Sequence, residues 1–117
     1  MIKIFVYGSL REGEYNHVFL ENEKYLHPGL TKRHYTFYDL GGFPAMVKGG
    51  THAVVGEIYE VSPETLERLD ILESHPQFYE RQEIVLQGGM VVQAYILNES
   101  HTQGRTIIRS GDWKKRH

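Results

Sequence analysis

The amino-acid sequence predicts an α+β fold in which one main helix packs on a small, closed or nearly closed β-sheet. Apolar, β-branched and aromatic stretches predict about six strands, whereas a single segment carries strong helix signals. The strands do not alternate regularly with helices, which argues against a doubly wound α/β fold. The chain has 117 residues, enough for one modest core but too few for two, so we expect residues 1–117 to form one domain.

The first strand is expected at residues 2–7, where nearly every side chain is apolar, as in strands buried on both faces. Residues 14–22 are expected to form a short helix with Val18 and Phe19 facing inward. Gly56 lies inside a later strand and indicates a bulge or a close backbone approach. Glycine pairs that favour turns separate the strands expected at residues 35–40, 45–47 and 54–61.

The main helix is expected to begin after Ser62, which is a preferred N-cap residue. Pro63 suits the first helical position, and Glu64 places an acid in the first turn. We expect the helix to run to about Glu73 or Ser74, because a proline follows shortly afterwards.

Two more strands are expected after the helix, at residues 79–86 and 90–97. Gly88 and Gly89 lie between them. A glycine pair between two apolar runs is a signal for a tight two-residue hairpin.

The net charge and the lengths of the apolar and basic runs argue against nucleic-acid binding and membrane insertion. The net charge of −2 and the pI near 6.4 give no basic surface of the kind that binds nucleic acid. The basic run at residues 114–117 is too short for a nucleic-acid-binding arm and is expected to be a solvated tail. The apolar run at residues 2–7 is too short for a signal peptide or a membrane span, so we expect a cytoplasmic protein without membrane contact.

The sequence contains no pattern that supports a metal site or a reactive thiol. The chain has no cysteine, which excludes disulfides, thiolate–metal sites and a cysteine nucleophile. We expect no metal site, because the histidines show no metal-binding spacing such as H-E-x-x-H. Five of the seven histidines are scattered between residues 27 and 101, and they are His27, His34, His52, His75 and His101.

Glu73 is out of place on the expected helix. On a helical wheel Leu66, Leu69 and Leu72 define the apolar face, and Glu73 falls between the first two. Burial and the negative end of the helix dipole both raise the pKa of a carboxyl group. A carboxyl group tuned toward neutrality suits general acid–base catalysis. An exposed Glu73, or one paired with Arg81, remains open from position alone.

The loop after the first strand is a second candidate feature, formed by Tyr7, Gly8, Ser9 and Leu10. A Gly-Ser pair can turn the backbone so that successive N–H groups bind an anion or a developing oxyanion. An ordinary turn has the same residues, so this alternative stays open. The chain has no G-x-S-x-G elbow, so Ser9 is expected to serve the loop and not as a hydrolase nucleophile.

Together these segments resemble the γ-glutamylcyclotransferase-like family, with the resemblance covering residues 1 to about 85 and a short tail. The Glu-x-x-Pro-x-x-Tyr-x-Arg spacing is most similar to that of γ-glutamylamine cyclotransferases. One departure is that many members have Gly after the glutamate, where this chain has Ser74. The residues that carry the resemblance are Tyr7-Gly8-Ser9-Leu10, Gly42-Phe43-Pro44-Ala45, Gly56-Glu57-Ile58-Tyr59, Leu69-Asp70, Glu73, Pro76, Tyr79, Arg81 and Ser110-Gly111-Asp112-Trp113.

The resemblance implies a fold built around a small mixed β-barrel with one packed helix. It implies a cyclotransferase that acts on a small γ-glutamyl substrate without a cofactor, as a monomer or small homo-oligomer. Glu73 would be the catalytic acid–base residue. The alternative is a non-catalytic, small-metabolite-binding member, which the presence of Glu73 disfavours. The substrate-binding residues implied are Tyr7, Gly8, Ser9, Leu10, Gly42 and Tyr79.

Overall fold

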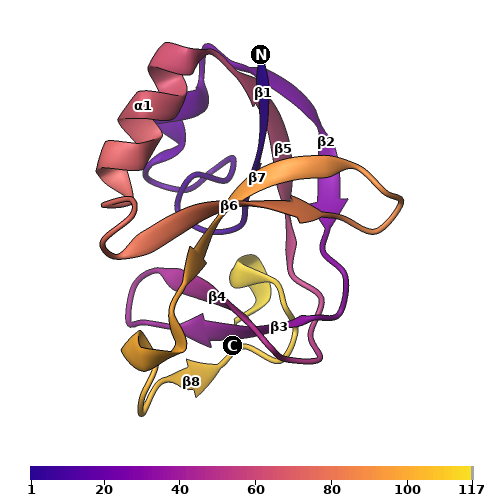
Figure 1. Ribbon diagram of the computed structural model, residues 1–117, viewed down its shortest axis with the longest axis vertical. Coiled ribbons are helices and arrows are strands. Elements are labelled where there is room, and N and C mark those ends of the chain that lie inside the picture. Colours follow the sequence, from indigo (N-terminus) through magenta and orange to yellow (C-terminus); the bar gives the residue numbers. More distant parts are fainter. Residues whose placement is uncertain (117) are drawn as a thin grey trace.

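The computed structural model describes residues 1–116, and His117, the last residue of the basic tail, lies outside the described residues. The strands form two sheets, and one main helix lies beside the larger sheet (Figure 1). The larger sheet has the strand order β2-β5-β1-β7-β6, and the smaller has the order β4-β3-β8. The elements are β1 (Ile2–Val6), η1 (His17–Leu20), β2 (Lys24–Leu30), β3 (Tyr35–Asp39), β4 (Pro44–Lys48), β5 (Val55–Val61), α1 (Pro63–Leu72), β6 (Tyr79–Val85), β7 (Val91–Leu97), η2 (Glu99–His101), β8 (Thr106–Ile107) and η3 (Trp113–Lys115).

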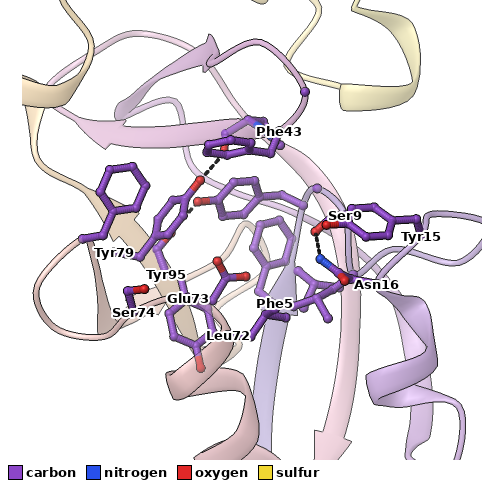
Figure 2. A pocket seen from close by; sticks show the side chains of 17 residues that line it. Phe5, Ser9, Tyr15, Asn16, Phe43, Leu72, Glu73, Ser74, Tyr79 and Tyr95 are labelled. Atoms are coloured by element: carbon purple, nitrogen blue, oxygen red, sulfur yellow. Dashed lines mark hydrogen bonds between the residues drawn. The ribbon is translucent and has the colours of Figure 1, made fainter.

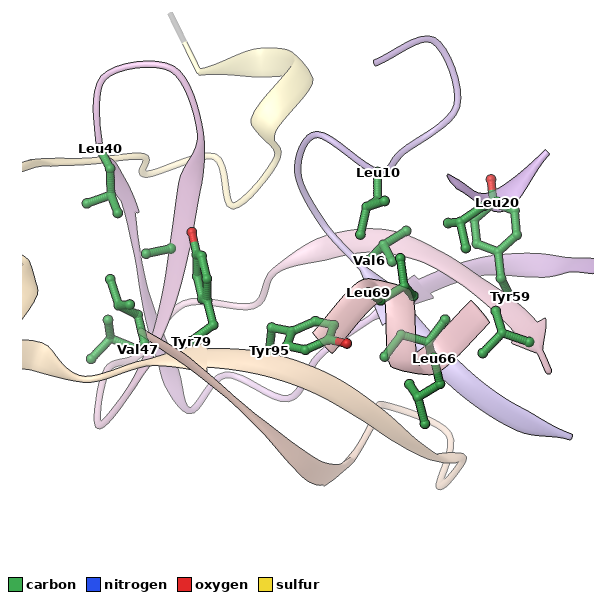
Figure 3. Close-up of a cluster of buried hydrophobic side chains, with 14 residues drawn as sticks. Val6, Leu10, Leu20, Leu40, Val47, Tyr59, Leu66, Leu69, Tyr79 and Tyr95 are labelled. Carbon is green, nitrogen blue, oxygen red and sulfur yellow. The ribbon is translucent and has the colours of Figure 1, made fainter. Parts of the chain in front are cut away.

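Strand β1 lies at the centre of the larger sheet, antiparallel to β5 and parallel to β7. Its alternate side chains enter two apolar clusters, as expected for a strand buried on both faces. Ile4 and Val6 join a first cluster, into which α1 packs Leu69 (Figure 3). Phe5 and Tyr7, the first residue after β1, join a second cluster that contains side chains from both sheets. The strand therefore ends inside the core, and the loop that follows it starts there.

The predicted α+β class with one main helix is confirmed, as are the strands expected at residues 2–7, 35–40, 45–47, 54–61, 79–86 and 90–97 to within a residue or two. Ser62 caps α1, because its Oγ accepts a hydrogen bond from the Thr65 N–H at 3.2 Å. Gly88 and Gly89 lie in the β6–β7 turn with positive φ of 93° and 97°. The turn has three residues, 87–89, and not the two expected, because the Leu86 N–H already donates to the carbonyl of Met90. A Cβ on Gly56 would lie 2.3 Å from the last carbonyl oxygen of β1, so the close approach is also confirmed.

The prediction for residues 14–22 is wrong in part. Only His17–Leu20 is helical, and it is a single 3-10 turn. Val18 is 60% exposed and Leu20 is buried, whereas Phe19 packs partly against the first cluster as expected. The expected α-helix repeats every 3.6 residues, whereas the 3-10 turn repeats every three. This difference in period places Val18 on the outer side of the turn.

Strand β2 was not predicted from the sequence. It carries Pro28 and Gly29, which normally argue against a strand, and it lacks an alternating apolar pattern. It pairs with β5 along its length at the edge of the larger sheet. Because an edge strand needs only one partner, proline is tolerated there.

Candidate active site

Glu73 occupies the C-cap position of α1. Its N–H donates to the carbonyl of Leu69 at 2.9 Å, so it continues the helical turn. Leu66 and Leu69 on the same face are buried, and the half-buried Glu73 carboxylate extends from that face into a cavity of about 330 Å³ (Figure 2). The placement of a carboxylate on the inner face of the helix is thus confirmed.

Three buried tyrosines from three different segments stand around this carboxylate: Tyr7 after β1, Tyr79 on β6 and Tyr95 on β7. Their hydroxyl groups donate elsewhere. Tyr7 donates to the carbonyl of Tyr95 at 2.5 Å, Tyr79 donates to the carbonyl of Pro44 at 2.6 Å, and Tyr95 donates to Asp70 at 2.7 Å. Burial, with the charge of Glu73 as a lesser cause, raises the pKa of Tyr79. The three tyrosines therefore line the cavity around Glu73 with uncharged side chains.

Glu73 has no ion-pair partner among residues 1–116. Arg81, the partner left open by the sequence, instead holds Asp70 through two hydrogen bonds of 2.8 and 3.1 Å. Burial without compensation raises the pKa of Glu73 to about 7. At neutral pH the group is therefore divided between acid and base forms, which suits a residue that both accepts and returns a proton.

Ser74 explains how the chain leaves the helix without the expected glycine. Its φ is 54°, the left-handed conformation that glycine usually supplies just after a helix. The Ser74 N–H bonds to the carbonyl of Ile71 at 3.1 Å, and the His75 N–H bonds to that of Asp70 at 2.9 Å. The serine thus adopts the backbone shape of a glycine, so Glu73 keeps its position at the cavity.

The loop after β1 forms the opposite side of the cavity. Gly8 packs on Pro44, where an added Cβ would lie 2.6 Å from the proline ring, so a larger residue would displace β4 or the loop. Ser9 Oγ accepts a hydrogen bond from Asn16 at 2.9 Å. The N–H groups of Gly8, Ser9 and Leu10 donate no backbone hydrogen bond to residues 1–116. These three N–H groups are therefore candidate donors to a ligand in the cavity that the same residues line.

Ion pairs formed by Arg11 attach the loop after β1 to β5 and to the C-terminal segment. Arg11 pairs with Glu57 of β5 at 2.9 Å and with Asp112 of the C-terminal segment at 2.8 Å. Glu57 also accepts hydrogen bonds from the Glu12 N–H and the Tyr59 hydroxyl. These contacts lower the pKa of both carboxyl groups against the opposing effect of burial.

The cavity brings together every site residue named from the sequence: Glu73, Tyr7, Gly8, Ser9, Leu10, Gly42 and Tyr79. Sequence reasoning missed Tyr95, Tyr15 and Asn16, which also line it. The only sequence signal for Tyr95 is its place on the inner side of the β7 pattern. Tyr15 and Asn16 lie in the segment for which a longer helix was expected, so their direction could not be derived.

The described residues contain neither a candidate metal site nor a membrane-spanning helix. Within residues 1–116 no group of three or more His, Asp or Glu side chains is arranged to hold a metal ion. In the same part of the chain, no helix is long and apolar enough to span a membrane.

Known proteins are similar to this chain in sequence and in fold. The family model described as gamma-glutamyl cyclotransferase, AIG2-like, matches residues 4–115. A relative from Vibrio cholerae is 43% identical over 113 residues, which cover 97% of this chain and 96% of that protein. The solution structure of Escherichia coli YtfP, named a gamma-glutamylcyclotransferase family protein, superposes with a TM-score of 0.76 at 35% identity and covers 98% of both chains. The crystal structure of an AIG2-like protein from Mus musculus has a TM-score of 0.69 at 29% identity and covers 86% of this chain and 78% of that one. The chain therefore belongs to the AIG2-like gamma-glutamyl cyclotransferase family.

Proposed function

We propose that this protein is a cyclotransferase that cleaves a γ-glutamyl amine or γ-glutamyl peptide and releases 5-oxoproline. The observation that carries the proposal is the unpaired, half-buried Glu73 at the centre of the cavity, with its pKa raised to about 7. Family membership supports the same class of reaction. The Glu-x-x-Pro-x-x-Tyr-x-Arg spacing favours γ-glutamyl amines over γ-glutamyl dipeptides as substrates.

The reaction is an internal aminolysis. The α-nitrogen of the glutamyl group forms a bond to its own δ-carbon, and the bond from that carbon to the leaving nitrogen breaks. The α-ammonium loses two protons as it becomes the lactam N–H, and the leaving nitrogen gains two as it departs as an ammonium. Glu73 carries these protons one at a time from the attacking nitrogen to the leaving nitrogen, so the carboxyl group ends the cycle unchanged. A positioned acid–base group of this kind typically contributes about 10²–10⁴-fold in rate.

The loop after β1 supplies the second requirement, which is stabilisation of negative charge. As the new bond forms, the carbonyl oxygen of the substrate becomes an oxyanion. The free N–H groups of Gly8, Ser9 and Leu10 lie at the same cavity as Glu73 and can donate to this oxygen or to the substrate α-carboxylate. Loss of one such donor typically costs about 10²–10³-fold in rate. Enclosing the substrate opposite the loop favours the folded conformer that cyclises.

The test is 5-oxoproline release from a panel of γ-glutamyl amines and dipeptides, measured for the parent and for Glu73→Gln. We expect at least a 100-fold lower kcat in the variant, because glutamine keeps the shape but cannot exchange a proton. Glu67→Gln is the matched control, since Glu67 lies on the same helix but is exposed. A folded parent that binds panel members without releasing 5-oxoproline would instead identify a metabolite-binding protein.

A further inference from the structure

Asn16, in the loop that leads from β1 into η1, is attached to Ser9 at two points. Its backbone N–H donates to the Ser9 carbonyl at 2.9 Å, and its side-chain amide donates to Ser9 Oγ, also at 2.9 Å (Figure 2). Both residues are half-buried, and both line the cavity. Within residues 1–116 no other group bonds to Ser9 Oγ, so the direction of this hydroxyl group depends on Asn16.

The residues on either side of Asn16 are tied to other segments of the fold. Glu14 accepts a hydrogen bond from the indole N–H of Trp113 at 3.1 Å. His17 Nδ1 donates to the carbonyl of Leu10 at 2.9 Å. Asn16 is therefore held in place by its neighbours, which a residue that orients another side chain requires.

The contact with Asn16 leaves the Ser9 hydroxyl free to donate. A serine hydroxyl group has one proton and two lone pairs. Because the Asn16 amide donates to one lone pair, the Ser9 proton points away from that amide, and it donates to no group within residues 1–116. Ser9 lines the cavity, so this proton is a candidate donor to a bound substrate, in addition to the backbone N–H groups of the same loop.

The position of Ser9 relative to Glu73 indicates which substrate atom receives this hydrogen bond. Under the proposed function, the tetrahedral carbon carries the attacking nitrogen, the leaving nitrogen and the oxyanion. Both nitrogens must face Glu73, because Glu73 exchanges protons with them. The oxyanion, a third substituent of the same carbon, then points away from Glu73, and Ser9 lies across the cavity on the opposite loop (Figure 2). The Ser9 hydroxyl is therefore on the side of the oxygen that becomes charged.

From these observations, and resting on the proposed function, we infer that Asn16 is a positioning residue of the reaction. Its amide orients the Ser9 hydroxyl, and this hydroxyl donates a hydrogen bond to the oxyanion. No covalent bond forms between Ser9 and the substrate. Because the oxyanion exists only in and near the transition state, Asn16 and Ser9 together raise kcat and leave KM almost unchanged.

A double-mutant cycle tests this inference, with 5-oxoproline release from a γ-glutamyl compound that the parent turns over as the assay. We expect Asn16→Ala and Ser9→Ala each to lower kcat about tenfold or more, with KM within about threefold of the parental value. Since Asn16 acts through Ser9, adding Asn16→Ala to Ser9→Ala should lower kcat by less than about twofold more. A rise in KM at unchanged kcat, or two losses of kcat that multiply fully, would overturn the inference.

Asn16→Asp separates the orientation of the hydroxyl from the shape of the side chain. Aspartate has the size of asparagine, but its carboxylate only accepts, so the Ser9 hydroxyl would donate to it and turn its proton away from the cavity. We therefore expect Asn16→Asp to lose about as much kcat as Asn16→Ala. Parental kcat in Asn16→Asp would show that the amide does not orient the hydroxyl, and the inference would be wrong.

The control is Asn98→Ala. The Asn98 side chain also bonds within its own loop, where it accepts from the Ser100 N–H at 2.9 Å, but it does not line this cavity. Its kcat should match that of the parent, and a loss as large as that of Asn16→Ala would contradict a specific role for Asn16.

Two outcomes separate this inference from the proposed function. If Glu73-dependent release of 5-oxoproline continues at the parental kcat in every Asn16 and Ser9 variant, the inference fails and the proposed function stands. If the folded parent releases no 5-oxoproline from any compound of the panel, the proposed function fails, and this inference fails with it.

Discussion

Replacing Glu73 with glutamine should stabilise the protein at high pH while it abolishes acid–base catalysis. Folding raises the pKa of this carboxyl group from its ordinary value of 4.5 to about 7 because the group is buried without a partner. The parent therefore carries no penalty below pH 4.5, loses stability as the pH rises toward 7, and carries the full penalty above 7. Each tenfold change in an acid dissociation constant corresponds to about 1.4 kcal/mol. Because the side chain keeps some contact with solvent, we expect the penalty at pH 8 to be roughly 1–3 kcal/mol.

Urea unfolding at pH 5, 6, 7 and 8 measures this penalty, followed by the fluorescence of Trp113, the only tryptophan, which is buried. Glutamine does not titrate, so the stability of Glu73→Gln minus that of the parent should grow by roughly 1–3 kcal/mol between pH 5 and pH 8. The exposed control Glu67→Gln should show a difference that does not change with pH. A difference for Glu73→Gln that stays constant within about 0.5 kcal/mol would refute a raised pKa, and with it the assigned catalytic advantage.

The two ion networks beside the cavity make separate predictions. Arg11→Met should destabilise the protein by roughly 3–5 kcal/mol in urea unfolding, because it leaves the buried Glu57 and the partly buried Asp112 without a counter-charge, whereas the exposed Arg109→Met should have little effect. Asp70→Asn should lower kcat roughly tenfold with little change in KM, because it loosens the helix end that positions Glu73 but touches no substrate. A change in KM alone, measured by steady-state kinetics, would contradict that positioning role.

The sequence predicted the parts of this molecule that depend on local chemistry. The position of Glu73 followed from the helix start and the helical period, both of which are set within about one turn. The pairing of β2 did not follow, because its Pro28 and Gly29 are tolerated only by virtue of a distant partner strand. The exposure of Val18 depends on the geometry of its loop, and the place of Tyr95 at the cavity depends on the β6–β7 register. Neither is determined by a local pattern.

The pairing of the arginines near the cavity affects both the pKa of Glu73 and the stability of the site. Arg11 joins the loop after β1 to β5 and to the C-terminal segment, and Arg81 joins the last turn of α1 to β6. Both arginines are ion-paired with carboxylates, and these pairs hold the two sides of the cavity in place, namely the loop after β1 and the end of α1. Glu73 lies between the two sides of the cavity, is half-buried and has no ion-pair partner among the described residues, so it relieves its burial by taking up a proton. A cation placed at the cavity would lower the pKa of Glu73 and weaken it as a base, so the engagement of Arg11 and Arg81 outside the cavity favours the proposed chemistry.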